Sequence, residues 1–141
     1  MSELRFERIK INDIELETYY YDNLHLMNVT AHPIIFIDTW KDKDKEVILP
    51  PCGLVVRAHI EEKVLNHKSN FELVDIKYVP EKQKLKILTL LKEKYPDIII
   101  VGSLIAAIAY KQLVWNMINI NTKYLPHGDH PKNLRRYKVF N

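Results

Sequence analysis

The sequence contains very little cysteine and glycine. Its 141 residues include one cysteine, Cys52, and three glycines. A single cysteine excludes an intrachain disulfide framework and a zinc site built from several thiolates. The glycine-rich pattern of a P-loop is absent, and so is the Gly-x-Ser-x-Gly pattern of a nucleophile elbow. These absences exclude two common families of phosphate-transfer and hydrolase sites.

Long hydrophobic runs are also missing. The apolar stretch 98–110 is shorter than the roughly 20 residues that a membrane-spanning helix needs, so we expect it to lie in a core. The N-terminus is charged, and no apolar signal-peptide segment follows it. We therefore expect an intracellular protein without a membrane partner.

Composition is that of a globular protein, with 47% hydrophobic and 28% charged residues. The net charge of +3 is too small to predict nucleic-acid binding by itself. The length predicts one domain over residues 1–141. Its expected parts are an N-terminal strand extension (1–23), a motif-bearing β part (24–80), a helix–strand–helix segment (81–116) and a basic C-terminal strand (117–141).

Alternation of apolar and polar residues predicts strands over much of the chain. Strands are expected at 54–60 and 71–79, with a polar segment from 61 to 70 between them. Helices are expected at 81–95, where leucines recur on one face, and from about 103 to 115. Strands outnumber helices and mostly follow one another directly. We therefore predict an α+β fold, a twisted and mostly antiparallel sheet with two helices packed on one face.

The sequence predicts a buried strand that turns sharply into a helix at Gly102 and Ser103, because four β-formers precede them and small and aliphatic residues follow. Unpaired N–H groups in the first turn of such a helix attract anions, so Ser103 and Gly102 are candidate ligand-binding residues. The alternative is that Ser103 is simply the N-cap, a role worth about 1 kcal/mol. The second interpretation is favoured.

Arg57 lies in an otherwise apolar strand segment. An arginine there faces solvent or a cleft, since burying its charge without a partner is costly. Its guanidinium is a candidate for bidentate binding of a phosphate or carboxylate. The alternative is a structural pair with Asp75 or Glu72 across the sheet.

Asn28, Thr30 and His32 alternate along one segment, so their side chains can point the same way. They are candidates for a polar ligand-binding edge. The alternative, which we favour, is that they hydrogen-bond the turn at Pro50 and Pro51 and stabilise the fold.

A metal site has weak support in the sequence. His127, Asp129 and His130 cluster around a glycine, but no fourth ligand is evident, and a hydrated loop is the preferred interpretation. We predict neither metal nor cofactor. Cys52 is interpreted as a small, partly buried filler, since spacing does not support a catalytic pair with a histidine.

The C-terminal segment holds the densest group of basic residues, and these are candidates for phosphate contacts with a nucleic acid. No recognised nucleic-acid-binding motif accompanies them, so a solvated strand is the preferred interpretation. The four residues are Lys132, Arg135, Arg136 and Lys138.

Three segments, in this order, resemble a family of small proteins of phages, prophages and archaeal viruses. The family patterns are N-[LV]-T-P-H-P-[IV], I-P-P-S-G-x-x-A-R and an apolar strand-to-helix junction. The matching segments here are Asn28–Ile34, Leu49–Arg57 and Ile99–Ala109. Ala31 stands where the family has proline and Cys52 where it has serine. The first 22 residues and the helix expected at 81–95 look like additions.

The resemblance implies a virus- or mobile-element-encoded accessory protein in a host cytoplasm, but no particular activity. Together with Arg57 and the Gly102–Ser103 step, it favours binding of a small anionic, nucleotide-type ligand without turnover, with counter-defence by sequestration as one setting. The alternative is a protein-interaction or homo-oligomeric structural protein that acts through its sheet edges. An enzyme ranks lowest, because no set of acid, base and nucleophile stands out. Ligand identity, partner and oligomeric state do not follow from the sequence.

Overall fold

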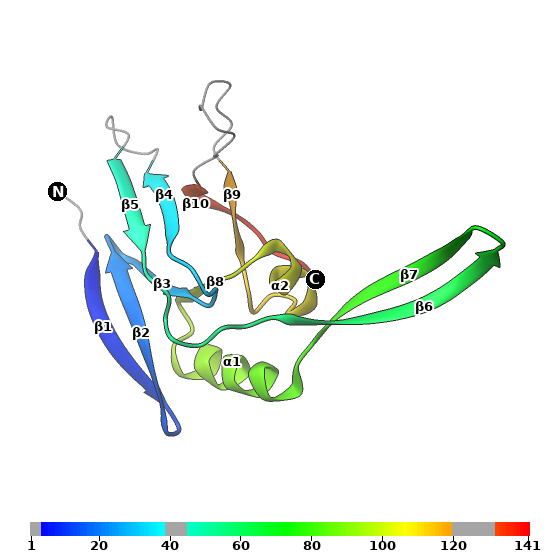
Figure 1. Cartoon of the computed structure of the whole chain (residues 1–141). Coiled ribbons are helices and arrows are strands. Elements are labelled where there is room, and N and C mark those ends of the chain that lie inside the picture. The colour runs from blue at the N-terminus through cyan, green and yellow to red at the C-terminus, as the bar shows by residue number, and fades with distance from the viewer. Residues whose placement is uncertain (1–3, 39–44, 120–131) are drawn as a thin grey trace.

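The structure is a computed structural model that describes residues 4–38, 45–119 and 132–141. The described residues form an α+β fold, as predicted, with strands forming most of it (Figure 1). The elements are β1 (Arg5–Ile11), β2 (Ile14–Tyr21), β3 (Leu24–Asn28), β4 (Ile34–Asp38), β5 (Lys45–Leu49), β6 (Ala58–Lys68), β7 (Phe71–Pro80), α1 (Lys82–Lys94), β8 (Ile98–Val101), α2 (Leu104–Ala109), β9 (Asn116–Asn119) and β10 (Lys132–Lys138).

The strands divide into three sheets rather than one. The first sheet has the order β1-β2-β3-β8, the second β5-β4-β10-β9, and β6 and β7 form a hairpin of their own. Most neighbouring strands are antiparallel, but β3 pairs with β8 and β4 with β10 in parallel. Each parallel pair joins strands that are distant in the sequence, because two parallel strands cannot be connected by a tight hairpin turn.

Three layers make up the body, which we define as the described residues outside β6 and β7. Both helices pack on one face of the first sheet, and the second sheet packs on its other face. Strand β8 shows why: Ile98 and Ile100 belong to the helix-side core, whereas Ile99 and Val101 belong to the core between the sheets. A strand covered on both faces needs a continuous apolar run, which explains the sequence of β8.

Short turns connect the first three strands. The turn between β1 and β2 contains Asn12 with φ of 53°, and the turn between β2 and β3 contains Asp22 with φ of 52°. Asparagine and aspartate tolerate this left-handed conformation better than most residues, so their positions follow from local chemistry. The predicted N-terminal strand extension is therefore a hairpin of two antiparallel strands, β1 and β2.

The second helix is shorter than predicted. It ends at Ala109, and the chain then returns to the first sheet, where the Trp115 N–H donates to the Ile100 carbonyl at 2.8 Å and the Gly102 N–H donates to the Trp115 carbonyl at 2.9 Å. These bonds pair the returning chain with the end of β8. A helix continuing to 115 would leave those groups without partners. Neither helix in the described ranges is long and apolar enough to cross a membrane.

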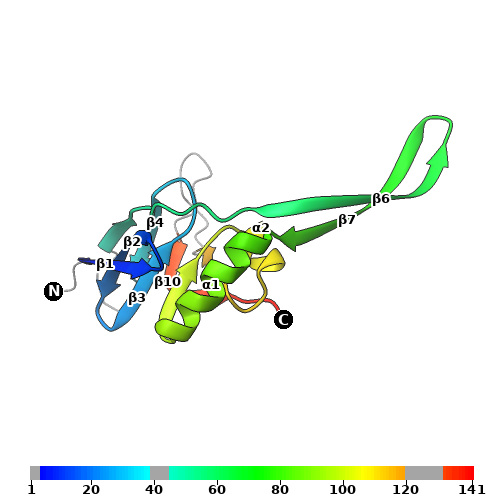
Figure 2. The ribbon, with the colours of Figure 1, turned by 90° about the horizontal axis from the view of Figure 1, so that it is seen from below.

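The arm, residues 58–80, is the largest departure from the predicted arrangement. The segment 61–70 was expected to be a polar connection, but β6 continues through it to Lys68 and turns directly into β7. Two charges of β6 lie opposite unlike charges on β7, where cross-strand pairs are favourable, so this polar sequence suits a hairpin. Figures 1 and 2 show the arm extending away from the body. The opposed pairs are Glu61 with Lys77 and Lys63 with Asp75.

Candidate functional site: a lysine-lined pocket

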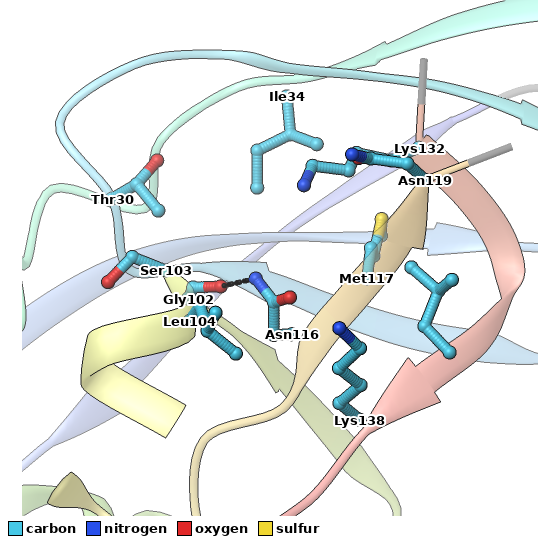
Figure 3. Close-up of a pocket in the computed structure, with 11 residues that line it drawn as sticks. Thr30, Ile34, Gly102, Ser103, Leu104, Asn116, Met117, Asn119, Lys132 and Lys138 are labelled. Carbon is cyan, nitrogen blue, oxygen red and sulfur yellow. Dashed lines mark hydrogen bonds between the residues drawn. The ribbon is translucent and has the colours of Figure 1, made fainter. Parts of the chain in front are cut away.

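A pocket of about 350 Å³ lies beside β9 and β10, next to the start of α2 (Figure 3). Its lining combines two lysines, polar amides and hydroxyls with apolar side chains, and none of the described lining residues is acidic. Such a combination of a few polar groups with apolar surface is typical of small-molecule sites. The lining residues are Thr30, Ile34, Gly102, Ser103, Leu104, Asn116, Met117, Ile118, Asn119, Lys132 and Lys138.

An irregularity in β10 brings the two lysines together. Lys132 lies opposite Asn119 and Lys138 opposite Asn116, with a register shift between them. The partners of the two lysines are three positions apart on β9, so the backbone positions of Lys132 and Lys138 are separated by roughly 10 Å along the strand. In a regular strand, two residues six positions apart would be separated by about 20 Å. Their side chains approach the pocket from two ends in Figure 3.

The electrostatics of the pocket favour a negative ligand. Burial lowers the pKa of Lys132 from its usual value, and the positive charge of Lys138 lowers it further. Both effects oppose the protonated form of Lys132, and no acidic residue of the described lining offsets them. An anion between the two lysines would supply a negative charge and hydrogen-bond acceptors.

Gly102 lines the pocket, and the packing around it leaves no room for a side chain. A Cβ at this position would lie 2.6 Å from Val114 Cγ1 and 3.3 Å from Val29 Cγ2. Its carbonyl accepts a hydrogen bond from the side-chain amide of Asn116 at 3.0 Å, which orients one wall of the pocket. The glycine predicted as a ligand-binding residue thus has a packing role at the pocket.

Ser103 is the N-cap of α2. Its hydroxyl accepts a hydrogen bond from the Ala106 N–H at 3.1 Å. Figure 3 shows the hydroxyl turned away from the space between the two lysines. The capping interpretation therefore accounts for the hydroxyl, and Ser103 contributes to the pocket mainly through the chain turn that it stabilises.

Asn28 joins the two motif segments that precede and follow the β4–β5 hairpin. It is fully buried, and its Nδ2 donates to the carbonyls of His32 at 2.9 Å and Leu49 at 3.0 Å. Its Oδ1 accepts from the Thr30 N–H at 2.9 Å. These contacts support the favoured structural interpretation. Asn28 and His32 do not line the pocket, whereas Thr30 does.

Arg57 lies near the start of the arm, away from the pocket lining, and it is exposed. Its carbonyl accepts a hydrogen bond from the Tyr110 hydroxyl at 2.9 Å, which ties the base of the arm to the body. The carboxylates considered as its partners lie farther along the arm, where Asp75 is opposite Lys63 and Glu72 is opposite His67. A role of the Arg57 guanidinium in ligand binding stays a prediction.

The four C-terminal basic residues have different environments. The side chain of Arg135 is only 8% exposed, and its Nη2 lies 2.8 Å from Asp22 Oδ2 and 3.2 Å from Asp38 Oδ2. The Tyr21 hydroxyl donates to the same Asp38 oxygen at 3.2 Å. Arg135 therefore connects the two sheets of the body. Arg136 is exposed, Lys132 and Lys138 line the pocket, and nucleic-acid binding by these residues stays a prediction.

Cys52 is buried, and burial raises the pKa of its thiol to about 11. The thiol is therefore protonated near neutral pH, as expected for a core filler. His127, Asp129 and His130 lie outside the described residues. Within the described ranges, no group of three or more His, Cys, Asp and Glu residues is placed to hold a metal ion.

Sequence reasoning missed the pairing of Lys132 with Lys138 in a pocket, and it missed Asn116 and Asn119. The lysines were noted only as part of a basic tail. No local signal in the sequence predicts the register shift that brings them together, because it depends on how β10 packs between β4 and β9.

Comparison of the chain with protein-family models, curated proteins and solved structures gives no match. The resemblance to a phage and prophage family therefore stays an expectation.

Proposed function

We propose that this protein binds a small anionic ligand of the phosphate or nucleotide class in the lysine-lined pocket, without turnover. The observation that carries this proposal is the approach of Lys132 and Lys138 to one pocket whose described lining contains no acidic residue. Two like charges held together are unfavourable in the empty protein, and a bound anion turns them into a favourable clamp.

The other walls favour a ligand with more than a charged group. Ile34, Leu104 and Met117 add apolar surface on several sides of the pocket, and the amides of Asn116 and Asn119 add polar atoms to its lining. A phosphate group suits the lysines, and a base or another flat apolar group suits the apolar side chains of the lining. The pocket volume lies at the lower end of the range for small-molecule sites, which fits a ligand about the size of a mononucleotide.

Sequestration is the simplest use of such binding. In the viral or mobile-element setting that the family resemblance implies, a protein that retains a host nucleotide would act in counter-defence. This part of the proposal rests on the resemblance, whereas the choice of ligand chemistry rests on the pocket.

Isothermal titration calorimetry tests the proposal directly. Inorganic phosphate, pyrophosphate and a panel of linear and cyclic nucleotides are titrated into wild type, Lys132→Met and Lys138→Met. Methionine keeps most of the length of the side chain and removes its charge. Each substitution should weaken binding roughly tenfold or more, since each removes a charge-assisted hydrogen bond of about 1.5–3 kcal/mol. The melting temperature should stay the same or rise, because the repulsion between the lysines is relieved.

The matched control is Lys86→Met on the exposed surface of α1, which should leave binding unchanged. Arg57→Ala is measured alongside. The proposal is wrong if wild type binds none of the ligands, or if Arg57→Ala weakens binding while the two pocket variants do not. Chromatography of the recovered ligand checks the absence of turnover, and a hydrolysed product would contradict it.

A further inference from the structure

The arm has one apolar face and one face that is charged along its base. Residues directly opposite each other in an antiparallel pair share a face, so the register assigns the faces. Glu62 is the only charged residue on the apolar face between Ala58 and Val64. The other face of the same stretch carries the opposed charges Glu61 and Lys77, and Lys63 and Asp75. The apolar face consists of Ile60, Val64, Val74, Ile76 and Tyr78.

The apolar face is covered at its base, where Tyr78 packs against the helix-side core, and three of its other side chains are about half exposed. Ile60 is 52% exposed, Val64 53% and Ile76 49%. Among the described residues, β6 and β7 form a sheet only with each other. An isolated two-stranded ribbon is marginally stable in water, and its outer edges present unpaired N–H and C=O groups that can pair with another strand.

The outer edge of β6 opposes pairing with a second copy of itself. Antiparallel pairing of two identical strands about a two-fold axis places one residue opposite its own copy. Centring the pair on Glu61, Glu62 or Lys63 would place that residue opposite a like charge, and centring it on Val64 would place Lys63 opposite the partner's Leu65. Like charges directly opposite each other are destabilising.

The outer edge of β7 has one register in which every neighbour matches. When Ile76 is placed opposite its own copy, Asp75 lies opposite the partner's Lys77, and this pair occurs twice. Val74 lies opposite the partner's Tyr78, also twice. Centring the pair on Asp75 or Lys77 would instead oppose like charges, and centring it on Val74 would place Leu73 opposite the partner's Asp75.

We propose that two copies of this chain associate through β7 in this register and form a four-stranded antiparallel sheet with the order β6-β7-β7-β6. One row of the charged face then reads Glu61, Lys77, the partner's Asp75 and the partner's Lys63. The signs alternate across the whole sheet. On the opposite face, the two Ile76 side chains meet between two Val74–Tyr78 pairs, which removes apolar surface from water.

The self-complementary charge pattern selects a second copy of the chain as the occupant of this edge. An isologous contact requires each residue to satisfy its counterpart twice, and Asp75 and Lys77 do so on either side of Ile76. The inference does not depend on the anion-binding proposal, because none of the described lining residues of the pocket belongs to the arm.

Charge exchange tests the register. Asp75→Lys combined with Lys63→Asp places a lysine opposite the partner's Lys77 and keeps an unlike pair within the hairpin. Lys77→Asp combined with Glu61→Lys places an aspartate opposite the partner's Asp75 and likewise keeps an unlike pair within the hairpin. Sedimentation equilibrium should show a reversible dimer for wild type, and each variant should weaken dimerisation roughly tenfold or more, since the symmetric contact is lost twice. An equimolar mixture of the two variants should regain the dimer, because both lysines of one variant then face the two aspartates of the other.

The matched controls are Glu93→Lys and Lys86→Asp on α1, which introduce charge reversals of the same kind away from the arm and should leave the dimer intact. Circular dichroism checks that all variants are folded. A wild type that stays monomeric at every concentration overturns the proposal. So does dimerisation of both charge-exchange variants at wild-type strength, or a mixture of the two that fails to recover the dimer.

Discussion

The body and the arm use similar residues in opposite ways. In the body, apolar side chains such as Leu26, Met27 and Phe36 are completely buried between layers. In the arm, Leu65 and Phe71 are 56% and 57% exposed. Both regions are built from strands rich in β-branched and aromatic residues. What differs is that the strands of the body have another layer against them, whereas the arm has one only at its base, where Ala58 and Tyr78 pack against the helix-side core.

This difference shows that a strand pattern and burial are separate properties. Alternation of polar and apolar residues predicts that a segment is extended, but another layer must be present before the apolar face is buried. In the body, the helices and the second sheet supply that layer on the two faces of the first sheet. The arm obtains part of its stability from cross-strand charge pairs, and much of its apolar face stays exposed.

The largest effect is expected where the body buries charge. Arg135→Ala should lower the free energy of unfolding by about 3–5 kcal/mol, because it removes the cation that pairs with the buried Asp38. Urea denaturation followed by circular dichroism measures the change. The control is the exposed neighbour, Arg136→Ala, whose effect should stay below about 0.5 kcal/mol. Equal midpoints for the two variants would show that the ion pair contributes nothing to the body.

A smaller loss is expected where the body is tightly packed. Gly102 directly follows β8, and Gly102→Ala should lower the free energy of unfolding by about 1–3 kcal/mol. The reason is that the new methyl group would overlap the side chain of Val114. A double-mutant cycle with Val114→Ala measures the contact. The space left by Val114 admits the new methyl, so the double variant should lose less stability than the sum of the single variants. Simple additivity would contradict the clash.

The smallest effect is expected in the arm. Leu65→Ala should change the free energy of unfolding by less than about 0.5 kcal/mol at protein concentrations where the chain is monomeric, because the side chain is more than half exposed. Thermal and urea unfolding measure it. A loss of about 2 kcal/mol or more, the size typical of a core leucine, would show that the arm packs against the body in solution.

Much of the fold was accessible from local patterns. The helix at 81–95 was predicted from leucines that recur on one face, and Leu88 and Leu91 are indeed buried. The strand before Gly102 was predicted from its apolar run, and the structure covers that strand on both faces. The segment 61–70 was predicted wrongly, because charged residues in a hairpin resemble a polar loop until their cross-strand partners are known.

The candidate site was less accessible. The predicted set included Thr30, Gly102 and Ser103, which the structure brings to one pocket, but the cations of that pocket were assigned to a basic tail. Arg57, the cation chosen for the site, lies elsewhere. The pairing of Lys132 with Lys138 depends on a register shift in β10, and such a shift reflects packing between distant strands.

Local sequence was sufficient to predict the α+β class, the positions of most strands and helices, and the sharp junction after β8. These follow from periodicity, turn chemistry and side-chain size, which act between residues near one another in the chain. The division of the strands into separate sheets, the sharing of a pocket by two lysines and the departure of the arm from the body came from the folded arrangement alone. Those features depend on which distant surfaces pack together, and packing is cooperative across the whole chain rather than encoded in any one segment.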